Sequence, residues 1–341
     1  MAPSDLPIVL YHYVFSPVAR RVVWYLTLRR IPYVQCMQPN ILPRPDVAQL
    51  GITYRRIPIL SIGRDVYLDS RLIIRKLEEL YPPSAAHPSL SATTGDQKAI
   101  ERLLDFFMTD SGIFRAASSC LPSTLPVMKD QAFLKDRAEF AGPPASKPIV
   151  EKAARRPTFL TLVRDAVELL ETTVLADGRD WVLNTSGPML ADIEAVWVLK
   201  WIAMIPGALP KDFIGAQQFP KVFAWIDRFT KTVDGISKEL GKPEAVKGDQ
   251  AAAKILNSTY AEPEGTVDGR ELVAEALGLK KGDTVKVFPT DSGVNHKETG
   301  TLLSLTSKEV VIEVEGPNGV VRVHSPRHGF TLSKFSEKAS L

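Results

Sequence analysis

Short apolar runs alternate with helical patterns over the first 80 residues. Residues 8–13, 33–37 and 57–60 are rich in β-branched and aromatic side chains, which is typical of buried strands. Between the first two runs, apolar residues recur at three- and four-residue steps after Ser16-Pro17, a favourable helix start. A turn, a returning strand at 65–68 and a helix at 71–80 follow. The order β-α-β and then β-β-α predicts an α/β layer, which we assign to residues 1–84.

The middle of the chain is expected to be all helical. Helical periodicity extends over residues 96–108, 129–140 and 149–175, with a loop at 141–147. The helix that begins near Pro188 is apolar nearly all round, which places it at a domain centre, so its tryptophans are core residues. At its start Asp192 can reach back in a capping box, but Met189 stands where the hydroxyl partner belongs. We assign this domain to residues 95–240.

The character of the chain changes again near residue 259. After one short helix at 271–277, strand patterns appear at 284–288, 300–305, 310–314 and 320–324, with turn residues between them. Short strands at this spacing predict a small barrel or curled sheet, similar to SH3-like modules, at residues 259–341. The predicted fold class is therefore α/β plus all-α, with a small β-barrel-like domain at the C-terminus.

Composition narrows the functional classes. A net charge of +3 on 341 residues does not indicate a nucleic-acid protein, and the C-terminal strands lack aromatic pairs for base stacking. No apolar run is long enough for a membrane span, and the start lacks a signal-peptide pattern. Two cysteines give no disulfide framework. We expect a cytoplasmic protein that binds neither nucleic acid nor membranes.

A metal site is not expected. His324 and His328 have a metal-like interval, but no cysteine accompanies them and Pro326 interrupts any helix there. The surrounding cluster with Arg322 and Arg327 is better interpreted as a solvated or structural basic turn.

One segment combines the groups that a zwitterionic ligand needs. A proline inside the strand at 57–60 removes a ladder hydrogen bond, and a cis peptide at Ile57-Pro58 would leave neighbouring backbone groups free for a ligand. Asp69 supplies a carboxylate. Ser70 can cap the next helix, whose N-terminus favours an anion. The segment therefore suits a ligand that carries both an ammonium and a carboxylate group.

These residues resemble the thioredoxin-like half of a glutathione S-transferase. In that family an Ile/Val-Pro pair with cis proline holds the cysteinyl backbone of glutathione, as Ile57-Pro58 would here. An acid or glutamine followed by serine holds its γ-glutamyl end, and Asp69-Ser70 match that pair. Arg56 could help at the peptide's carboxylate side. The resemblance extends over residues 8–233. It implies a homodimer, and domains appended like this one occur on some fungal transferase-like proteins.

Three hydroxyl groups are candidates for the contact with the glutathione sulfur. Ser16 resembles the family's Ser-Pro or Cys-Pro version of the catalytic position, where a hydroxyl stabilises the thiolate. From the residues alone a plain helix cap is the better interpretation of Ser16, and the family context reverses that preference. Tyr11 and Tyr13 are the rivals, and strand alternation puts them on the same face.

Three functions remain open on these patterns. The first is a glutathione-dependent transferase or isomerase, with glutathione as co-substrate and a hydrophobic electrophile between the two domains. The second is a glutathione-independent cyclase, dehydratase or isomerase of specialised metabolism. It is suggested because Asp69, Met189 and the extra domain depart from the usual transferase. The third is a non-enzymatic scaffold that binds protein partners.

Overall fold

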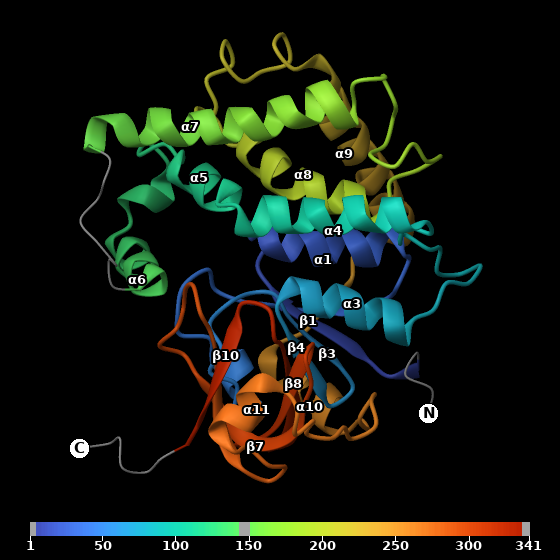
Figure 1. Cartoon of the computed structure of the whole chain (residues 1–341), viewed down its shortest axis with the longest axis vertical. Coiled ribbons are helices and arrows are strands. Elements are labelled where there is room, and N and C mark those ends of the chain that lie inside the picture. The colour runs from blue at the N-terminus through green and yellow to red at the C-terminus, as the bar shows by residue number, and fades with distance from the viewer. Residues whose placement is uncertain (1–4, 143–150, 336–341) are drawn as a thin grey trace.

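A computed structural model describes residues 5–142 and 151–335 of the protein. In Figure 1 most helices form the upper part of the molecule and the strands lie below, with α1 (Pro17–Leu28) and α3 (Ser70–Leu80) between them. Residues 143–147 of the expected loop, and the expected helix start at 149, lie outside the described residues.

The N-terminal part has the expected thioredoxin-like arrangement. Strand β1 pairs parallel with β2 and antiparallel with β3, which pairs antiparallel with β4. All the residues of β1, β3 and β4 are buried, which explains their continuous apolar runs. The elements besides α1 and α3 are β1 (Ile8–His12), β2 (Val34–Met37), α2 (Pro45–Ala48), β3 (Ile59–Ile62) and β4 (Asp65–Leu68).

The helical part is organised around α8 (Leu190–Ala203), whose first ten residues are all buried. Its start confirms the one-sided capping box: the Asp192 carboxylate accepts hydrogen bonds from the backbone N–H of Met189 at 2.9 Å and of Val182 at 3.0 Å. The surrounding helices are α4 (Gly95–Asp110), α5 (Ile113–Ser119), α6 (Gln131–Ala141), α7 (Lys152–Leu169) and α9 (Pro220–Leu240).

The C-terminal part is a sheet, and all four expected strands are present. A fifth strand, β10, was not predicted; it pairs with β6 through five residues. The strands were expected to form a separate barrel-like unit, whereas they continue the N-terminal sheet. The elements are β5 (Glu244–Ala245), α10 (Gly248–Leu256), α11 (Leu272–Leu277), β6 (Thr284–Pro289), β7 (Glu298–Leu305), β8 (Glu309–Gly316), β9 (Gly319–Pro326) and β10 (Phe330–Lys334).

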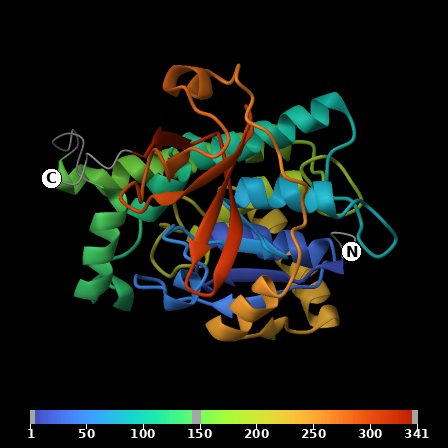
Figure 2. The ribbon, with the colours of Figure 1, turned by 90° about the horizontal axis from the view of Figure 1, so that it is seen from below.

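One sheet of ten strands results, in the order β10-β6-β7-β8-β9-β4-β3-β1-β2-β5. The join is the parallel pair β4 and β9, in which Asp65, Val66 and Tyr67 oppose Arg322, Val323 and His324. Without β9, strand β4 would be an edge with unpaired backbone groups. Figure 2 shows the red and orange C-terminal strands next to the blue N-terminal strands.

A buried group of charges lies at this join, which we call the β4–β9 seam. Both ring nitrogens of His324 are bonded to carboxylates, Nε2 to Asp65 at 2.9 Å and Nδ1 to Glu309 at 2.6 Å. Lys76 Nζ lies 2.6 Å from Glu262 and 2.9 Å from Glu309. Because both nitrogens face carboxylates, the ring is held as an imidazolium: burial lowers the pKa of His324, but the two hydrogen bonds outweigh it and raise the pKa to about 9.

Because of this seam, we expect the stability of the folded protein to fall in mild alkali. The folded-state pKa of His324 lies above its ordinary value of 6.5, so its contribution is complete below pH 6.5 and is lost as the pH rises through 9. We expect a loss of about 3 kcal/mol in the free energy of unfolding across that interval. Urea denaturation at both ends of the interval measures it.

His324→Gln should remove most of that pH dependence while lowering stability overall, because it leaves buried carboxylates without their cation. His328→Gln is the matched control, because that imidazole is half exposed. Equal alkaline losses in the wild type and in His324→Gln would contradict the role given to the seam.

Candidate functional site

The peptide bond Ile57-Pro58 is cis, as expected, and lies directly before β3. Ile57 is buried in the cluster that also contains Ile59 and Leu68. The strand therefore begins after the proline, at Ile59, and loses no ladder hydrogen bond to it.

Asp69 and Ser70 start helix α3, but their roles differ from the expected ones. Asp69, not Ser70, is the N-cap: its Oδ1 accepts a hydrogen bond from the Arg71 N–H at 2.9 Å. Asp69 also has φ of 72°, in a region that non-glycine residues rarely adopt. Such a conformation costs free energy and often marks a functional position. Ser70 is the first helical residue, and its Oγ accepts from Arg21 Nη1 at 3.0 Å.

Arg21 connects this helix start to the helical domain. Its side chain is 1% exposed and pairs with Asp105 of α4 at 2.7 Å and with Glu194 of α8. Burial opposes the charge on Arg21, but the carboxylates of Glu194, Asp105 and Asp69 raise its pKa. Burial also raises the pKa of Glu194 to about 7, against the effect of Arg21. This network was not predicted from the sequence, although an acid inside the apolar helix α8 was a signal for it.

Asp69 lies among cations. Besides Arg21, its carboxylate raises the pKa values of Arg56 and Arg71, although burial is the largest influence on each and lowers it. A carboxylate, a helix N-terminus and nearby guanidinium groups can bind the ammonium and the carboxylate of one amino-acid end. The zwitterion site expected at Asp69 and Ser70 stays a prediction.

Ser16 is the N-cap of α1. Its Oγ accepts a hydrogen bond from the Ala19 N–H at 3.2 Å, and the residue is only 2% exposed. The neighbours on its N-terminal side, Val14 and Phe15, are exposed. The capping interaction uses the oxygen as an acceptor and leaves the hydroxyl proton available for donation.

The two tyrosines differ in accessibility. Tyr11 is fully buried in β1, and among the described residues its hydroxyl has no hydrogen-bond partner. Burial, followed by Cys36 and Asp46, raises the pKa of Tyr11 far above its usual value, so its hydroxyl is no acid at neutral pH. Tyr13 is half-buried and packs against the same hydrophobic cluster. Of these two rivals of Ser16, only Tyr13 reaches the surface.

Arg56 does not stand free for a ligand. Its guanidinium donates to the Ser292 carbonyl from Nε at 3.1 Å and from Nη2 at 2.6 Å, and pairs with Asp291. Both partners lie in the loop between β6 and β7 of the appended sheet. To bind a ligand's carboxylate, as expected, Arg56 would have to give up its bonds to Ser292 and Asp291.

The same appended sheet supports the segment before the cis proline. Glu298 of β7 is 1% exposed, and its carboxylate accepts hydrogen bonds from the N–H of Thr53 at 2.6 Å and from the N–H of Tyr54. Burial raises the pKa of Glu298 to about 7. The C-terminal strands are therefore part of the candidate site's framework.

Helix α6 covers the other side of this segment. Its Asp136 and Glu139 pair with the buried Arg55, Asp136 at 2.9 Å, and the Phe140 ring lies 5.0 Å below the guanidinium. Asp136 also accepts from the N–H of Leu42 at 3.0 Å. The loop after β2, Arg55 and α6 thus form one hydrogen-bonded unit beside Tyr13.

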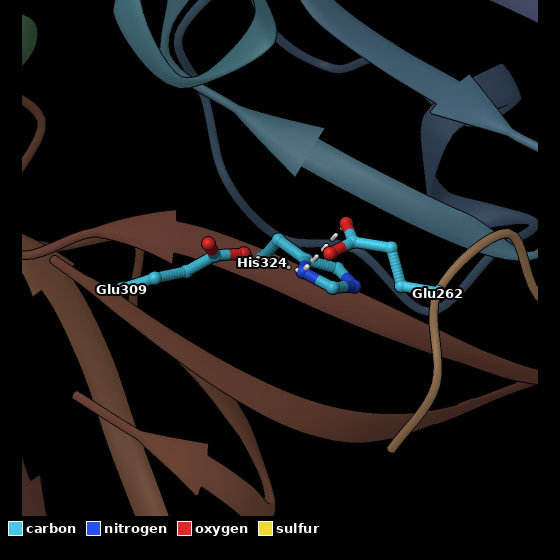
Figure 3. Close-up of side chains that lie close together, drawn as sticks. All are labelled: Glu262, Glu309 and His324. Atoms are coloured by element: carbon cyan, nitrogen blue, oxygen red, sulfur yellow. Dashed lines mark hydrogen bonds and ion pairs between the residues drawn. The ribbon is translucent and has the colours of Figure 1, made fainter. Parts of the chain in front are cut away.

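One group of side chains has ligand atoms close enough for a metal ion. Figure 3 shows Glu262, Glu309 and His324, whose possible ligand atoms lie within 4.8 Å of one another. This is the β4–β9 seam, and the Lys76 ammonium group already contacts both glutamates. Because an ammonium and an imidazolium take the positions that a cation would need, the seam is an ion-pair network.

The described part of the chain has no helix that is both long and apolar enough to cross a membrane.

Comparisons with known proteins agree with this geometry. Residues 10–85 match the family model of the glutathione S-transferase N-terminal domain, and residues 116–238 match a domain of unknown function. No curated protein matches the sequence.

Two solved structures show the extent of the likeness. A GST-like protein from Pseudomonas syringae is 24% identical with a TM-score of 0.64, covering 98% of this chain and 100% of that one. The β-etherase LigF from Sphingobium sp. strain SYK-6 is 18% identical with a TM-score of 0.50, covering 69% of this chain and 100% of that one. The first likeness includes the appended strands, since it spans nearly the whole chain. The protein thus contains a glutathione S-transferase N-terminal domain and has the glutathione S-transferase fold, extended by a C-terminal sheet.

Proposed function

We propose that the protein is a glutathione-dependent transferase or isomerase that acts on a hydrophobic, electrophilic small molecule. The observation that carries the proposal is the placement of cis Ile57-Pro58 and the strained Asp69 at the start of α3, within a matched glutathione S-transferase N-terminal domain. Backbone groups beside Pro58 would bind the cysteinyl part of glutathione. Asp69 would bind its ammonium group, and Ser70 with the helix start its carboxylate.

Ser16 would act at the sulfur. A thiol near pKa 8.5 reacts as its thiolate, and a hydroxyl donor at a helix N-terminus favours that form. Bound glutathione supplies the nucleophile, whose electron pair adds to the electrophilic carbon. In a transfer reaction the leaving group departs with the former bonding pair, whereas in an isomerisation the thiol is released again.

A second candidate keeps the fold without glutathione. Its support is that Arg56 is bound to Asp291 and Ser292, and that Ser16 is nearly inaccessible and already caps α1. An apolar metabolite would then bind between the N-terminal and helical domains for a cyclisation, dehydration or isomerisation of specialised metabolism. Titration of the wild-type protein with glutathione separates the two candidates. Failure to bind both glutathione and any hydrophobic small molecule would leave the non-enzymatic scaffold.

Two further proposals concern the cellular location and the source of the protein. A cytoplasmic location is supported by Cys36 and Cys120, which are buried free thiols. The fungal character suggested by the appended domain stays a prediction, because the whole-length likeness above is to a bacterial protein.

Asp69→Ala should weaken glutathione binding by about 1–3 kcal/mol, because a charged hydrogen-bond partner of the ammonium is lost. Calorimetric titration measures this. Asp130→Ala is the matched control, since Asp130 is also an aspartate N-cap, on α6, accepting from the Ala132 N–H at 2.9 Å. An affinity equal to the wild type in folded Asp69→Ala would place glutathione elsewhere.

Ser16→Ala separates capping from catalysis. Loss of the cap should lower the free energy of unfolding by about 1 kcal/mol. If the hydroxyl also donates to the thiolate, turnover of an activated aryl halide should fall by about 10²–10³. Thr94→Ala on α4 removes a comparable cap, which accepts from the Gln97 N–H at 3.3 Å, and should affect stability alone. Normal turnover in a destabilised Ser16→Ala would leave Ser16 a cap and direct attention to Tyr13.

We propose that the protein is a homodimer, as the resemblance implies. A two-fold pairing of the N-terminal domain of one subunit with the helical domain of the other is the expected arrangement. The outer edge of β4 is bonded to β9, so the partner subunit must use another surface. Sedimentation at micromolar concentration decides the matter, and a single monomeric species there would refute the dimer.

A further inference from the structure

We propose that a second pocket, between α3, α4 and the appended sheet, binds a small molecule that combines an aromatic ring with a carboxylate. This α3–α4 pocket has a volume of about 240 Å³. Arg71 and Arg75 of α3 and Phe106 of α4 form one side of it, and Lys308 and His328 from turns of the C-terminal sheet form the other. The pocket exists only because β9 joins β4 and brings those turns against α3. The proposal is independent of the glutathione hypothesis.

The lining holds three positively charged side chains, Arg71, Arg75 and Lys308, and one carboxylate, Asp105. Arg71 is neutralised, with its guanidinium 3.1 Å from Asp105 and 2.8 Å from Asp110. Arg75 has only long contacts, 3.3 Å to Glu309 and 3.8 Å to Glu79, and Glu309 is already shared with Lys76 and His324.

Lys308 is the third cation of the lining. In residues 5–142 and 151–335, no carboxylate lies within ion-pair distance of its ammonium group, and the residue is exposed. An ammonium that faces a pocket beside a loosely paired guanidinium attracts an anion. Arg75 and Lys308 are therefore the two groups that we expect to bind the ligand's carboxylate.

The second feature of the pocket is the exposed aromatic ring of Phe106. Phe106 is 45% exposed, although its helix buries Leu104 and Met108 on the other face. The Arg71 guanidinium lies 5.7 Å from the Phe106 ring centre, and the His328 ring meets it edge-on at 5.3 Å. His328 is fixed in turn by a 3.0 Å contact with Asp110. A ring that is contacted by Arg71 and His328 and is still exposed offers a stacking surface to a flat ligand.

These two features together define the class of ligand. A purely inorganic anion would not use the Phe106 ring, and a neutral aromatic molecule would not use Lys308. Leu72 and Pro326, which also line the pocket, extend its apolar wall. The volume admits one or two fused rings with a short acidic group. An aromatic carboxylate satisfies both the charge and the apolar wall.

The test uses 1-naphthoate, its neutral amide 1-naphthamide, and acetate as probes, in calorimetric titrations of the full-length protein. A ligand of this size should bind with Kd of about 1 mM, and both the amide and acetate should bind about tenfold more weakly or not at all. Lys308→Gln and Phe106→Ala should each weaken naphthoate binding about three- to tenfold, and Lys308→Arg should restore it. Ser16→Ala should bind naphthoate as the wild type does, because Ser16 caps α1 and does not line this pocket, which separates the pocket from the glutathione site.

Matched controls are Lys211→Gln, an exposed lysine of the helical domain, and Leu103→Ala, an apolar residue of α4 that is 65% exposed outside the pocket. Circular dichroism melting verifies that each variant is folded. Equal affinity for naphthoate and naphthamide would overturn the proposal. So would undiminished naphthoate binding in folded Lys308→Gln and Phe106→Ala, or equal losses in the two controls.

Discussion

The parallel pairing of β4 with β9 is the constraint on which the rest of this structure depends. It joins the strands β1 to β5 to the five C-terminal strands β6 to β10, which gives one sheet of ten strands. Asp65 of β4 and His324 of β9 meet across that pair, and His324 also contacts Glu309 of the neighbouring strand β8. Charges buried there are tolerated because each has an opposite partner within hydrogen-bond distance. The pairing also covers an edge that would otherwise offer unpaired N–H and C=O groups to another chain.

The appended sheet consequently participates in the candidate site. Through Glu298 it supplies an acceptor for the backbone that leads to the cis proline, and through Asp291 and Ser292 it holds Arg56. Buried backbone donors are costly when unsatisfied, so the Glu298 contact is structurally important to this segment. A function assigned from the thioredoxin-like half alone would omit residues that shape the candidate site.

Arg21 links the candidate site to the helical domain. It joins the start of α3, through Ser70, to Asp105 of α4 and Glu194 of α8. A buried guanidinium with several donors has a narrow range of acceptable geometries. The helical domain is therefore tied to the start of α3 by a rigid contact, and Asp69 takes its unusual backbone conformation at the point where the two domains meet.

The sequence by itself determined the local features of this protein. The cis proline pair, the apolar helix α8, the incomplete capping box at Met189 and Asp192, and four C-terminal strands were all predicted, because each depends on side chains only a few residues apart. The tertiary structure alone decided how distant segments meet. Tyr67 opposes His324, Thr53 meets Glu298 and Arg21 reaches Glu194, and no spacing in the chain encodes such pairs. It also decided that Arg56 turns to Asp291. The physical reason is that hydrogen bonds and burial of charge depend on three-dimensional proximity, whereas periodicity and capping depend on neighbours along the chain.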